Sequence, residues 1–290
     1  MSNNMNNQVQ QFSDQHKTDS LGSEAYQRLR NNQHFGSGFP TLLYKEFRRF
    51  WRVALQTILA PVVTSLLYLL VFSHVLEGRV QAYPDSNIVI DYVAFLIPGL
   101  IMMSMQQNAF ANASSSLIQS RITGNLVFIL LPPMSAYELY AAYVLGGVAR
   151  GLLVGIFLWL FSMLFRVVLP YNILWVLVFG VMACGIMSTL GLVAGLWAEK
   201  FDQLAVFQNF LIMPLSFLSG VFYSTHSLPP FWQAVSQWNP VFYMIDGMRY
   251  GFFGVSDSSP WLCLFVVGGV FIFVSIIALR LIVSGYKLRN

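Results

Sequence analysis

The chain has 290 residues, of which 56% are hydrophobic and only 10% charged, with a formal net charge of +4. An ordinary soluble domain carries roughly 25% charged residues, so these proportions exclude that class and indicate an integral membrane protein. The basic residues lie beside the apolar runs, where membrane topology would place them, and therefore do not indicate a nucleic-acid partner.

Residues 1–38 are predicted to form a disordered cytoplasmic tail. Twelve Asn and Gln residues lie between Asn3 and Gln33, with few aliphatic side chains. Such a segment cannot bury enough apolar surface to offset its loss of conformational entropy. It also lacks the basic start and apolar core of a signal peptide, so we expect the first apolar span to direct insertion. Residues 39–290 are predicted to form one six-helix transmembrane domain.

Residues 39–52 are predicted to form an amphipathic helix at the cytoplasmic interface. Apolar residues recur there at helical spacing, at Leu43, Phe47, Phe50, Trp51 and Ala54. Charged residues, mostly basic, fill the positions between them, a pattern typical of helices that lie on an anionic leaflet. A second interpretation stays open, in which the charges only flank and orient the first span.

Six apolar segments of about 20 residues or more follow, each long enough to cross a hydrocarbon core of about 30 Å. They lie near residues 53–72, 93–113, 138–165, 173–197, 205–224 and 260–282. If the N-terminus is inside, twelve Lys and Arg residues lie on the cytoplasmic side and three on the outer side. This bias predicts that both termini are cytoplasmic.

The third span contains an intramembrane charge, Arg150, and small residues at regular spacing. The small residues are Gly147, Gly151 and Gly155, with Gly191 and Gly195 at the same spacing in the fourth span. Such stripes let helices approach closely, either within one bundle or across a dimer. An arginine inside a span marks a polar contact, unless its long side chain reaches an interface.

Two connecting segments are too apolar for plain solvent loops. Residues 114–135 are predicted to contain a short in-plane helix that docks on a partner and ends at the pair Pro132-Pro133. Residues 219–254 combine prolines and aromatic residues with the charged Asp246 and Arg249. This combination predicts short interfacial or re-entrant helices at the outer side.

No enzyme signature is present in the sequence. It contains no H-E-x-x-H, G-x-S-x-G or C-x-x-C motif, and its four histidines lack metal-ligand spacing. No lysine follows a glycine, so this polypeptide has no P-loop for ATP. If the protein is driven by ATP, the motor must be another chain.

Several separated motifs resemble those of ABC-2 type transport permeases. They are Pro98–Ser104 (PGLIMMS), Gly146–Gly151 (GGVARG), Leu218–Tyr223 (LSGVFY), Leu228–Trp232 (LPPFW), Asn239-Pro240 and Met244–Gly251 (MIDGMRYG). The resemblance covers roughly residues 38–290 and implies an all-α fold. That fold has six transmembrane helices, an N-terminal interfacial helix, a cytoplasmic coupling helix and outer re-entrant helices.

The resemblance also implies a half-transporter in the bacterial inner membrane. Two copies of the chain, a homodimer among membrane lipids, would pair with two copies of a separate ABC ATPase, which would bind ATP and Mg. No cofactor or metal is expected in this chain. The implied coupling helix spans Leu117–Leu130, and its candidate ATPase-coupling residues are Leu117, Arg121, Leu126, Val127, Ile129 and Leu130. Related coupling regions commonly carry an acidic residue, whereas residues 114–137 have none here.

The implied export pathway lies at the dimer interface, along spans one, two and five. The candidate pathway-lining residues are Gln56, Thr64, Gln106, Gln107, Asn108, Asn209 and Ser216. Polar contacts between packed helices are the alternative for each of them. A lipid-linked, polysaccharide or small amphipathic substrate would fit. An ion-coupled secondary transporter, which usually needs a buried carboxylate relay, and a non-transporting scaffold are the rival functions.

Overall fold

The structure, a computed structural model, describes residues 38–76, 90–130, 134–225 and 228–285. The predicted tail therefore lies almost entirely outside the described residues. Within the described ranges all regular secondary structure is helical. The helices are α2 (Gly38–Arg52), α3 (Ala54–Leu76), α4 (Tyr92–Ile122), α5 (Leu126–Leu130), α6 (Ala136–Ser162), α7 (Ile173–Trp197), α8 (Phe201–Phe207), the π-helix η1 (Gln208–Ile212), α9 (Met213–Phe217), α10 (Pro230–Gln237), α11 (Pro240–Phe253) and α12 (Pro260–Val283).

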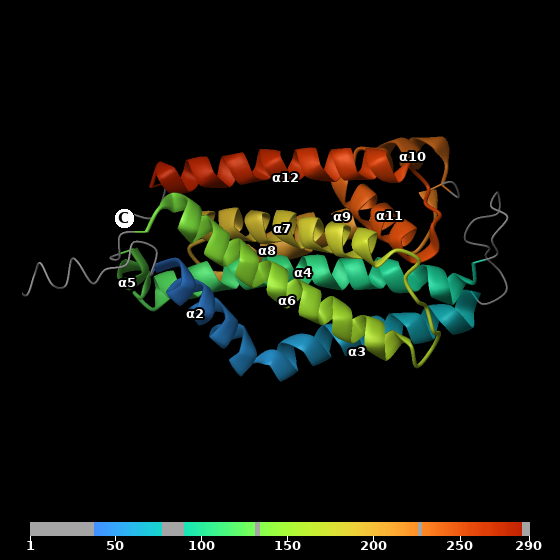
Figure 1. The fold of residues 1–290 in the computed structure, drawn as a ribbon, viewed down its shortest axis with the longest axis horizontal. Coiled ribbons are helices and arrows are strands. Elements are labelled where there is room, and N and C mark those ends of the chain that lie inside the picture. Colours follow the sequence, from blue (N-terminus) through green and yellow to red (C-terminus); the bar gives the residue numbers. More distant parts are fainter. Residues whose placement is uncertain (1–37, 77–89, 131–133, 226–227, 286–290) are drawn as a thin grey trace, which may run out of the picture.

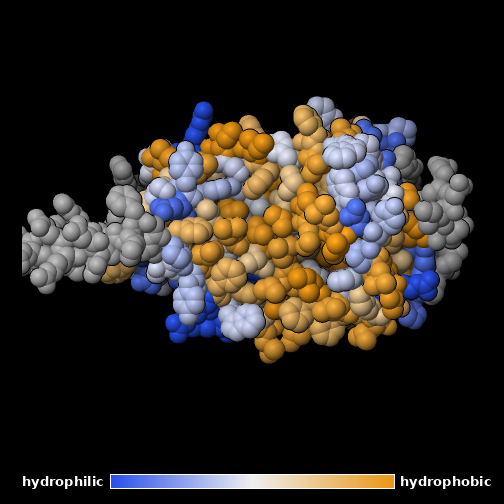
Figure 2. All heavy atoms as spheres, in the orientation of Figure 1, coloured by the Kyte–Doolittle hydropathy of each residue, from blue (hydrophilic) through white to orange (hydrophobic). Residues whose placement is uncertain are grey.

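The long helices run roughly along the long axis of the molecule, with α4 in the middle (Figure 1). The most apolar stretch of α4 is 94% buried, whereas those of α3 and α12 are 22% and 17% buried. The face seen in Figure 2 carries a broad apolar band between more polar ends. A surface of this kind is suited to a bilayer rather than to water.

Among the described residues, five helices are long and apolar enough to cross a membrane: Ala54–His74 within α3, and the whole of α4, α6, α7 and α12. They correspond to five of the six predicted spans, and the all-helical membrane architecture is confirmed to that extent. The predicted fifth span, residues 205–224, corresponds to α8, η1 and α9 instead of one regular helix.

A proline explains the irregular fifth segment. Pro214 has no N–H, and in a regular α-helix its ring would clash with the carbonyl one turn earlier. The π-turn immediately precedes it, and the Met213 N–H bonds to the Gln208 carbonyl oxygen. The helical path ends at Phe217, seven residues before the predicted end of the span, and Gly220 in the following turn has a φ of 76°.

The second span is longer than predicted, because α4 continues to Ile122. The polar residues after position 113 do not end the helix, since the hydroxyls of Ser114, Ser115 and Ser120 donate to carbonyl oxygens of the preceding turn. The helix stops at Gly124, which has a φ of 72°. Residues 114–122 therefore belong to a spanning helix and not to a separate in-plane helix.

The glycine stripes of α6 and α7 pack within the bundle. A Cβ on Gly191 would collide with the backbone carbonyl of Phe110 in α4, and one on Gly151 would lie 2.5 Å from the Cys184 Sγ in α7. The intramolecular interpretation of these stripes is confirmed, because their close contacts are with helices of the same chain.

Helix α2 turns only part of its predicted apolar face to the bundle, with Phe50 buried and Leu43 partly buried. Its buried residues are Leu42, Glu46 and Phe50, one per turn. Phe47 and Trp51, predicted to lie on its apolar face, are 41% and 70% exposed. Glu46 and Phe50 hold α2 to the protein, and the exposed rings of Phe47 and Trp51 are left for the bilayer interface.

The two ends of the described chain lie at the same end of the bundle. Leu42 in α2, Leu126 in α5 and Ile282 in α12 belong to one buried cluster. Helices α10 and α11 lie at the opposite end (Figure 1). There α11 is buried against α7, α12 and α4.

Candidate functional site

Helix α5 lies beside α2 at the end of the bundle (Figure 1). The side chain of Leu126 is buried in the cluster that contains Leu42, and Ile129 packs against the same cluster. Phe128, by contrast, is 70% exposed. Two aliphatic side chains therefore hold α5 to the bundle, and an aromatic ring faces the surroundings.

The six predicted coupling residues do not share one surface. Leu117 is only 1% exposed and belongs to α4. Arg121, also in α4, donates from Nη1 to the Ala198 carbonyl oxygen at 2.6 Å and from Nη2 to that of Leu196 at 3.1 Å. It thereby caps the C-terminal end of α7, where free carbonyls and the helix dipole favour a cation. The side chains of Val127 and Leu130 lie outside the described part of the chain.

Phe128 was not among the residues predicted from the sequence. It lies in an unbroken apolar run, Leu126–Leu130, and a helix of one turn has too short a pattern to show which side is buried. The packing of Leu126 against residues of α2 and α6 shows which side of α5 is buried and leaves Phe128 on the other side.

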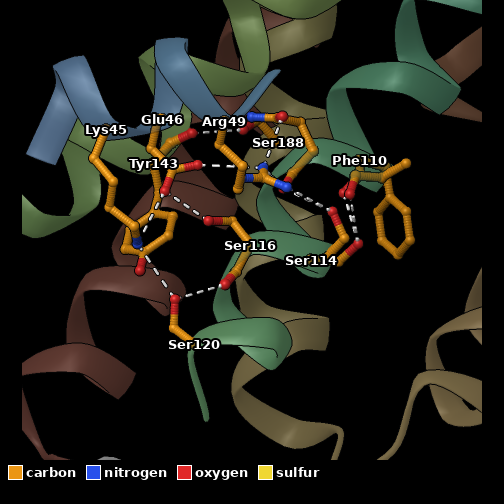
Figure 3. Close-up of polar contacts among 12 residues, drawn as sticks. Lys45, Glu46, Arg49, Phe110, Ser114, Ser116, Ser120, Tyr143 and Ser188 are labelled. Atoms are coloured by element: carbon orange, nitrogen blue, oxygen red, sulfur yellow. Dashed lines mark hydrogen bonds and ion pairs between the residues drawn. The ribbon is translucent and has the colours of Figure 1, made fainter. Parts of the chain in front are cut away.

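A buried carboxylate ties α2 to α4 (Figure 3). Glu46 is 1% exposed, and its Oε1 accepts a 2.6 Å hydrogen bond from the Ser116 hydroxyl. Its second oxygen lies 3.3 Å from Arg49 Nη2, and Lys45 Nζ lies 3.5 Å from Oε1. Gly146 in α6 makes room for this carboxylate, because a Cβ there would lie 3.0 Å from that of Glu46.

The two basic residues of this cluster, Arg49 and Lys45, also form hydrogen bonds with further residues of α4. Arg49 Nη2 donates to both the backbone oxygen and Oδ1 of Asn112, each at 2.9 Å. Lys45 Nζ donates to the Ser120 hydroxyl at 3.3 Å. Burial lowers the pKa of Lys45, an effect that the neighbouring Glu46 charge opposes. The sequence signal for this anchor was the single acid of α2, spaced four residues from Leu42 and from Phe50.

The candidate pathway residues separate into two groups. Gln56 and Thr64 on α3 and Asn209 on η1 are exposed on the single chain. The members on α4 and α9 lie inside the bundle or at its edge: Gln106, Gln107, Asn108 and Ser216. Gln106 Nε2 contacts the Met244 Sδ at 3.3 Å, and the Ser216 hydroxyl donates to the Ile212 carbonyl. One chain does not bring these residues together into one described cavity.

Arg150 makes the polar contact expected of an intramembrane charge. Its Nη2 donates to Asn108 Oδ1 at 3.1 Å, and the side chain is half-buried between α6 and α4. Asn108 in turn donates to the Ser104 carbonyl oxygen of its own helix.

A fully buried arginine holds segments together at the opposite end of the bundle. Arg249 in α11 is fully buried, lies 3.7 Å from the centre of the Phe95 ring, and donates to the carbonyl oxygens of Gly220 and Val221. The Tyr92 hydroxyl donates to the next carbonyl, that of Phe222. The turn after α9 is thus attached to both α4 and α11.

Asp246, one turn before Arg249, holds the segment that leads into α12. Its carboxylate accepts hydrogen bonds from the backbone N–H groups of Asp257 and Ser258, each at 2.8 Å. Across the described residues no group of three or more His, Cys, Asp or Glu side chains is placed to hold a metal ion. The polar groups of both ends therefore make structural contacts between segments.

The chain matches a known family in sequence. Residues 38–253 match the family model described as ABC-2 type transporter. The chain is 39% identical over 247 residues to the inner membrane transport permease YadH of Escherichia coli (strain K12), covering 85% of this chain and 94% of that protein. The YadH protein of Shigella flexneri matches equally well. The capsule polysaccharide export inner-membrane protein BexB of Haemophilus influenzae is 25% identical over 171 residues, 59% of this chain and 63% of BexB.

Proposed function

This chain belongs to the ABC-2 type transporter family, and we propose that it is the permease subunit of an ATP-driven exporter in a bacterial inner membrane. The observation that carries the proposal is the arrangement of α5. Leu126 is buried in the bundle and Ile129 packs against the same cluster, while Phe128 is 70% exposed at the end that also carries α2. Because the sequence contains no P-loop, ATP and Mg would bind to a separate ABC ATPase that docks at this end.

A docked ATPase would be mechanically connected to the spanning helices. Leu126 of α5 shares a buried cluster with Leu139 of α6 and Leu196 of α7. Arg121 joins the end of α4 to the end of α7, and Glu46 joins α2 to α4. A displacement of α5 would therefore act on α2, α4, α6 and α7 together. ATP would drive the change by binding one arrangement of the complex more tightly than the other.

The functional unit would be two permease copies with two ATPase copies. The polar residues Gln56, Thr64 and Asn209 are exposed on α3 and η1. If a second copy packed against these helices, the same residues of both copies would line a shared pathway. The segment α8–η1–α9 would complete a sixth crossing, with both termini in the cytoplasm. In support of outward transport, one relative is named for the export of capsule polysaccharide. A lipid-linked, polysaccharide or small amphipathic substrate fits this proposal.

The decisive experiment is purification of the tagged chain from its native membrane in a mild detergent, with identification of the proteins that co-purify. We expect a P-loop ATPase in near-equal amount. Phe128→Asp should abolish that association. Phe231→Asp is the matched control, because Phe231 is 69% exposed on another short helix, α10, at the opposite end.

The outcomes separate the competing functions. Loss of the ATPase in Phe128→Asp but not in Phe231→Asp would support docking at α5. A wild-type preparation without an ATPase, repeated after crosslinking, would contradict the proposal. It would favour an ion-coupled carrier or a scaffold.

A further inference from the structure

Two guanidinium groups contact consecutive turns on the same face of α4. Arg49 of α2 donates to Asn112 Oδ1 at 2.9 Å, and Arg150 of α6 donates to Asn108 Oδ1 at 3.1 Å. The two asparagines are four residues apart, which places them about 6 Å from each other along the helix.

Only one of the two charges is balanced. Arg49 lies 3.3 Å from the Glu46 carboxylate. Arg150 has no carboxylate within 4.0 Å among the residues that the structure describes, and its Nε has no hydrogen-bond partner there. The neutral amide of Asn108 satisfies one N–H group, but it does not compensate the charge.

The position of Arg150 makes an unbalanced charge unfavourable. It is the fifteenth residue of the 27-residue helix α6, roughly 21 Å along the helix axis from Ala136. An arginine near the middle of a spanning helix is destabilising unless it is paired or reaches polar surroundings, and it therefore marks a functional site by default. The side chain is half-buried, so part of the guanidinium is available to a ligand.

The surroundings favour an anion. Helix α2 carries Arg48 and Arg52 exposed on its surface, and Arg52 follows Arg49 by three residues, which places the two on neighbouring positions of the helix. A basic interfacial helix attracts the anionic lipids of the cytoplasmic leaflet. Guanidinium groups bind phosphate through paired hydrogen bonds and keep their charge in apolar surroundings.

We propose that Arg150, held by Asn108 and flanked by Arg49 and Asn112, is the binding site for a phosphate group at the junction of α2, α4 and α6. The phosphate would be carried by the head group of a lipid or by a soluble phosphate compound. The site is separate from the docking surface of α5, and it does not depend on ATP hydrolysis. Binding can therefore be measured on the purified permease alone.

The test is native mass spectrometry of the full chain released from detergent, titrated with phosphatidylglycerol or with diacylglycerol, which lacks phosphate. We expect saturable binding of phosphatidylglycerol that is weakened at least tenfold in Arg150→Gln and partly retained in Arg150→Lys. Arg166→Gln is the matched control, because Arg166 is an exposed arginine in the loop between α6 and α7. Inorganic phosphate identifies the source: competition at millimolar concentration indicates a soluble phosphate ligand, and its absence indicates the lipid head group.

Equal affinity of wild type and Arg150→Gln for phosphatidylglycerol would overturn the proposal, as would equal binding of diacylglycerol. If Arg150→Gln does not fold, wild-type protein crosslinked to a photoreactive phosphatidylglycerol replaces it. Labelling of the peptides around Arg49, Asn108 or Arg150 would support the site. Labelling confined to other peptides would contradict it.

Discussion

The carboxylate of Glu46 accepts a 2.6 Å hydrogen bond from the hydroxyl of Ser116, a residue 70 positions later in the chain. Glu46 is on the interfacial helix α2 and Ser116 is on the central helix α4. With Arg49 and Lys45 at the same carboxylate, this contact makes α2 part of the bundle. Movement of α4 and movement of α2 along the membrane surface are therefore linked.

Removal of this carboxylate should destabilise the protein strongly. Glu46→Ala leaves the partly buried Arg49 and Lys45 without their counter-charge, and breaking a buried ion pair costs roughly 3–5 kcal/mol. We expect a clear fall in the melting temperature in detergent. Glu138→Ala is the control: Glu138 is a partly exposed residue of the capping box at the start of α6, where the N-cap side chain of Ser135 remains, so the loss should not exceed about 1 kcal/mol. Equal melting of the two variants would contradict a buried anchor.

Two neighbouring residues of α5 should respond differently to aspartate. Leu126→Asp places a charge in the buried cluster with Leu42 and Leu139 and should lower the melting temperature, because an unpaired buried charge is strongly unfavourable. Phe128→Asp changes a side chain that is 70% exposed and should leave melting unchanged while ATPase association is lost. The measurement is thermal melting of both variants beside co-purification. The same melting temperature for both would show that α5 is not oriented as described.

A single methyl group should disturb the contact between α7 and α4. Gly191→Ala directs its Cβ into the Phe110 carbonyl of α4, and overpacking of this kind costs roughly 1–3 kcal/mol. Gly269→Ala in α12 is the control, because no atom lies within 4 Å of its added Cβ. Alanine favours helix by about 1 kcal/mol over glycine, so the control should melt at the same or a higher temperature. Stabilisation by Gly191→Ala would contradict the close approach.

Lysine at position 249 should not preserve the stability that Arg249 gives the protein. The guanidinium lies over the Phe95 ring and donates from one nitrogen to two carbonyl oxygens, a geometry that an ammonium group on a flexible stem does not reproduce. Hydrogen bonds from charged groups contribute roughly 1.5–3 kcal/mol, so we expect Arg249→Lys to lower the melting temperature. It should also increase protease cleavage near Gly220. Arg166→Lys, at an exposed arginine, should change neither measurement; unchanged cleavage in Arg249→Lys would argue against the attachment of this turn.

The sequence was most informative where a property depends on local composition. The long apolar runs predicted the five spanning helices, because the length needed to cross a bilayer is a property of each run by itself. The same reasoning was less accurate at α4, which continues past Ala113 to Ile122. Serine hydroxyls bonded to their own helix satisfy polar groups that hydropathy counts as unfavourable.

The sequence alone determined that this is a helical membrane protein with family motifs and no P-loop. The tertiary structure decided which faces of the short helices are buried: Glu46 of α2 lies inside, and Phe128 of α5 lies outside. It also decided that Arg121 caps α7. These outcomes depend on partners 70 or more residues away, such as Ser116 for Glu46 and Leu196 for Arg121. A periodic pattern along one helix shows that it has two faces, but only packing against distant helices determines which face is covered.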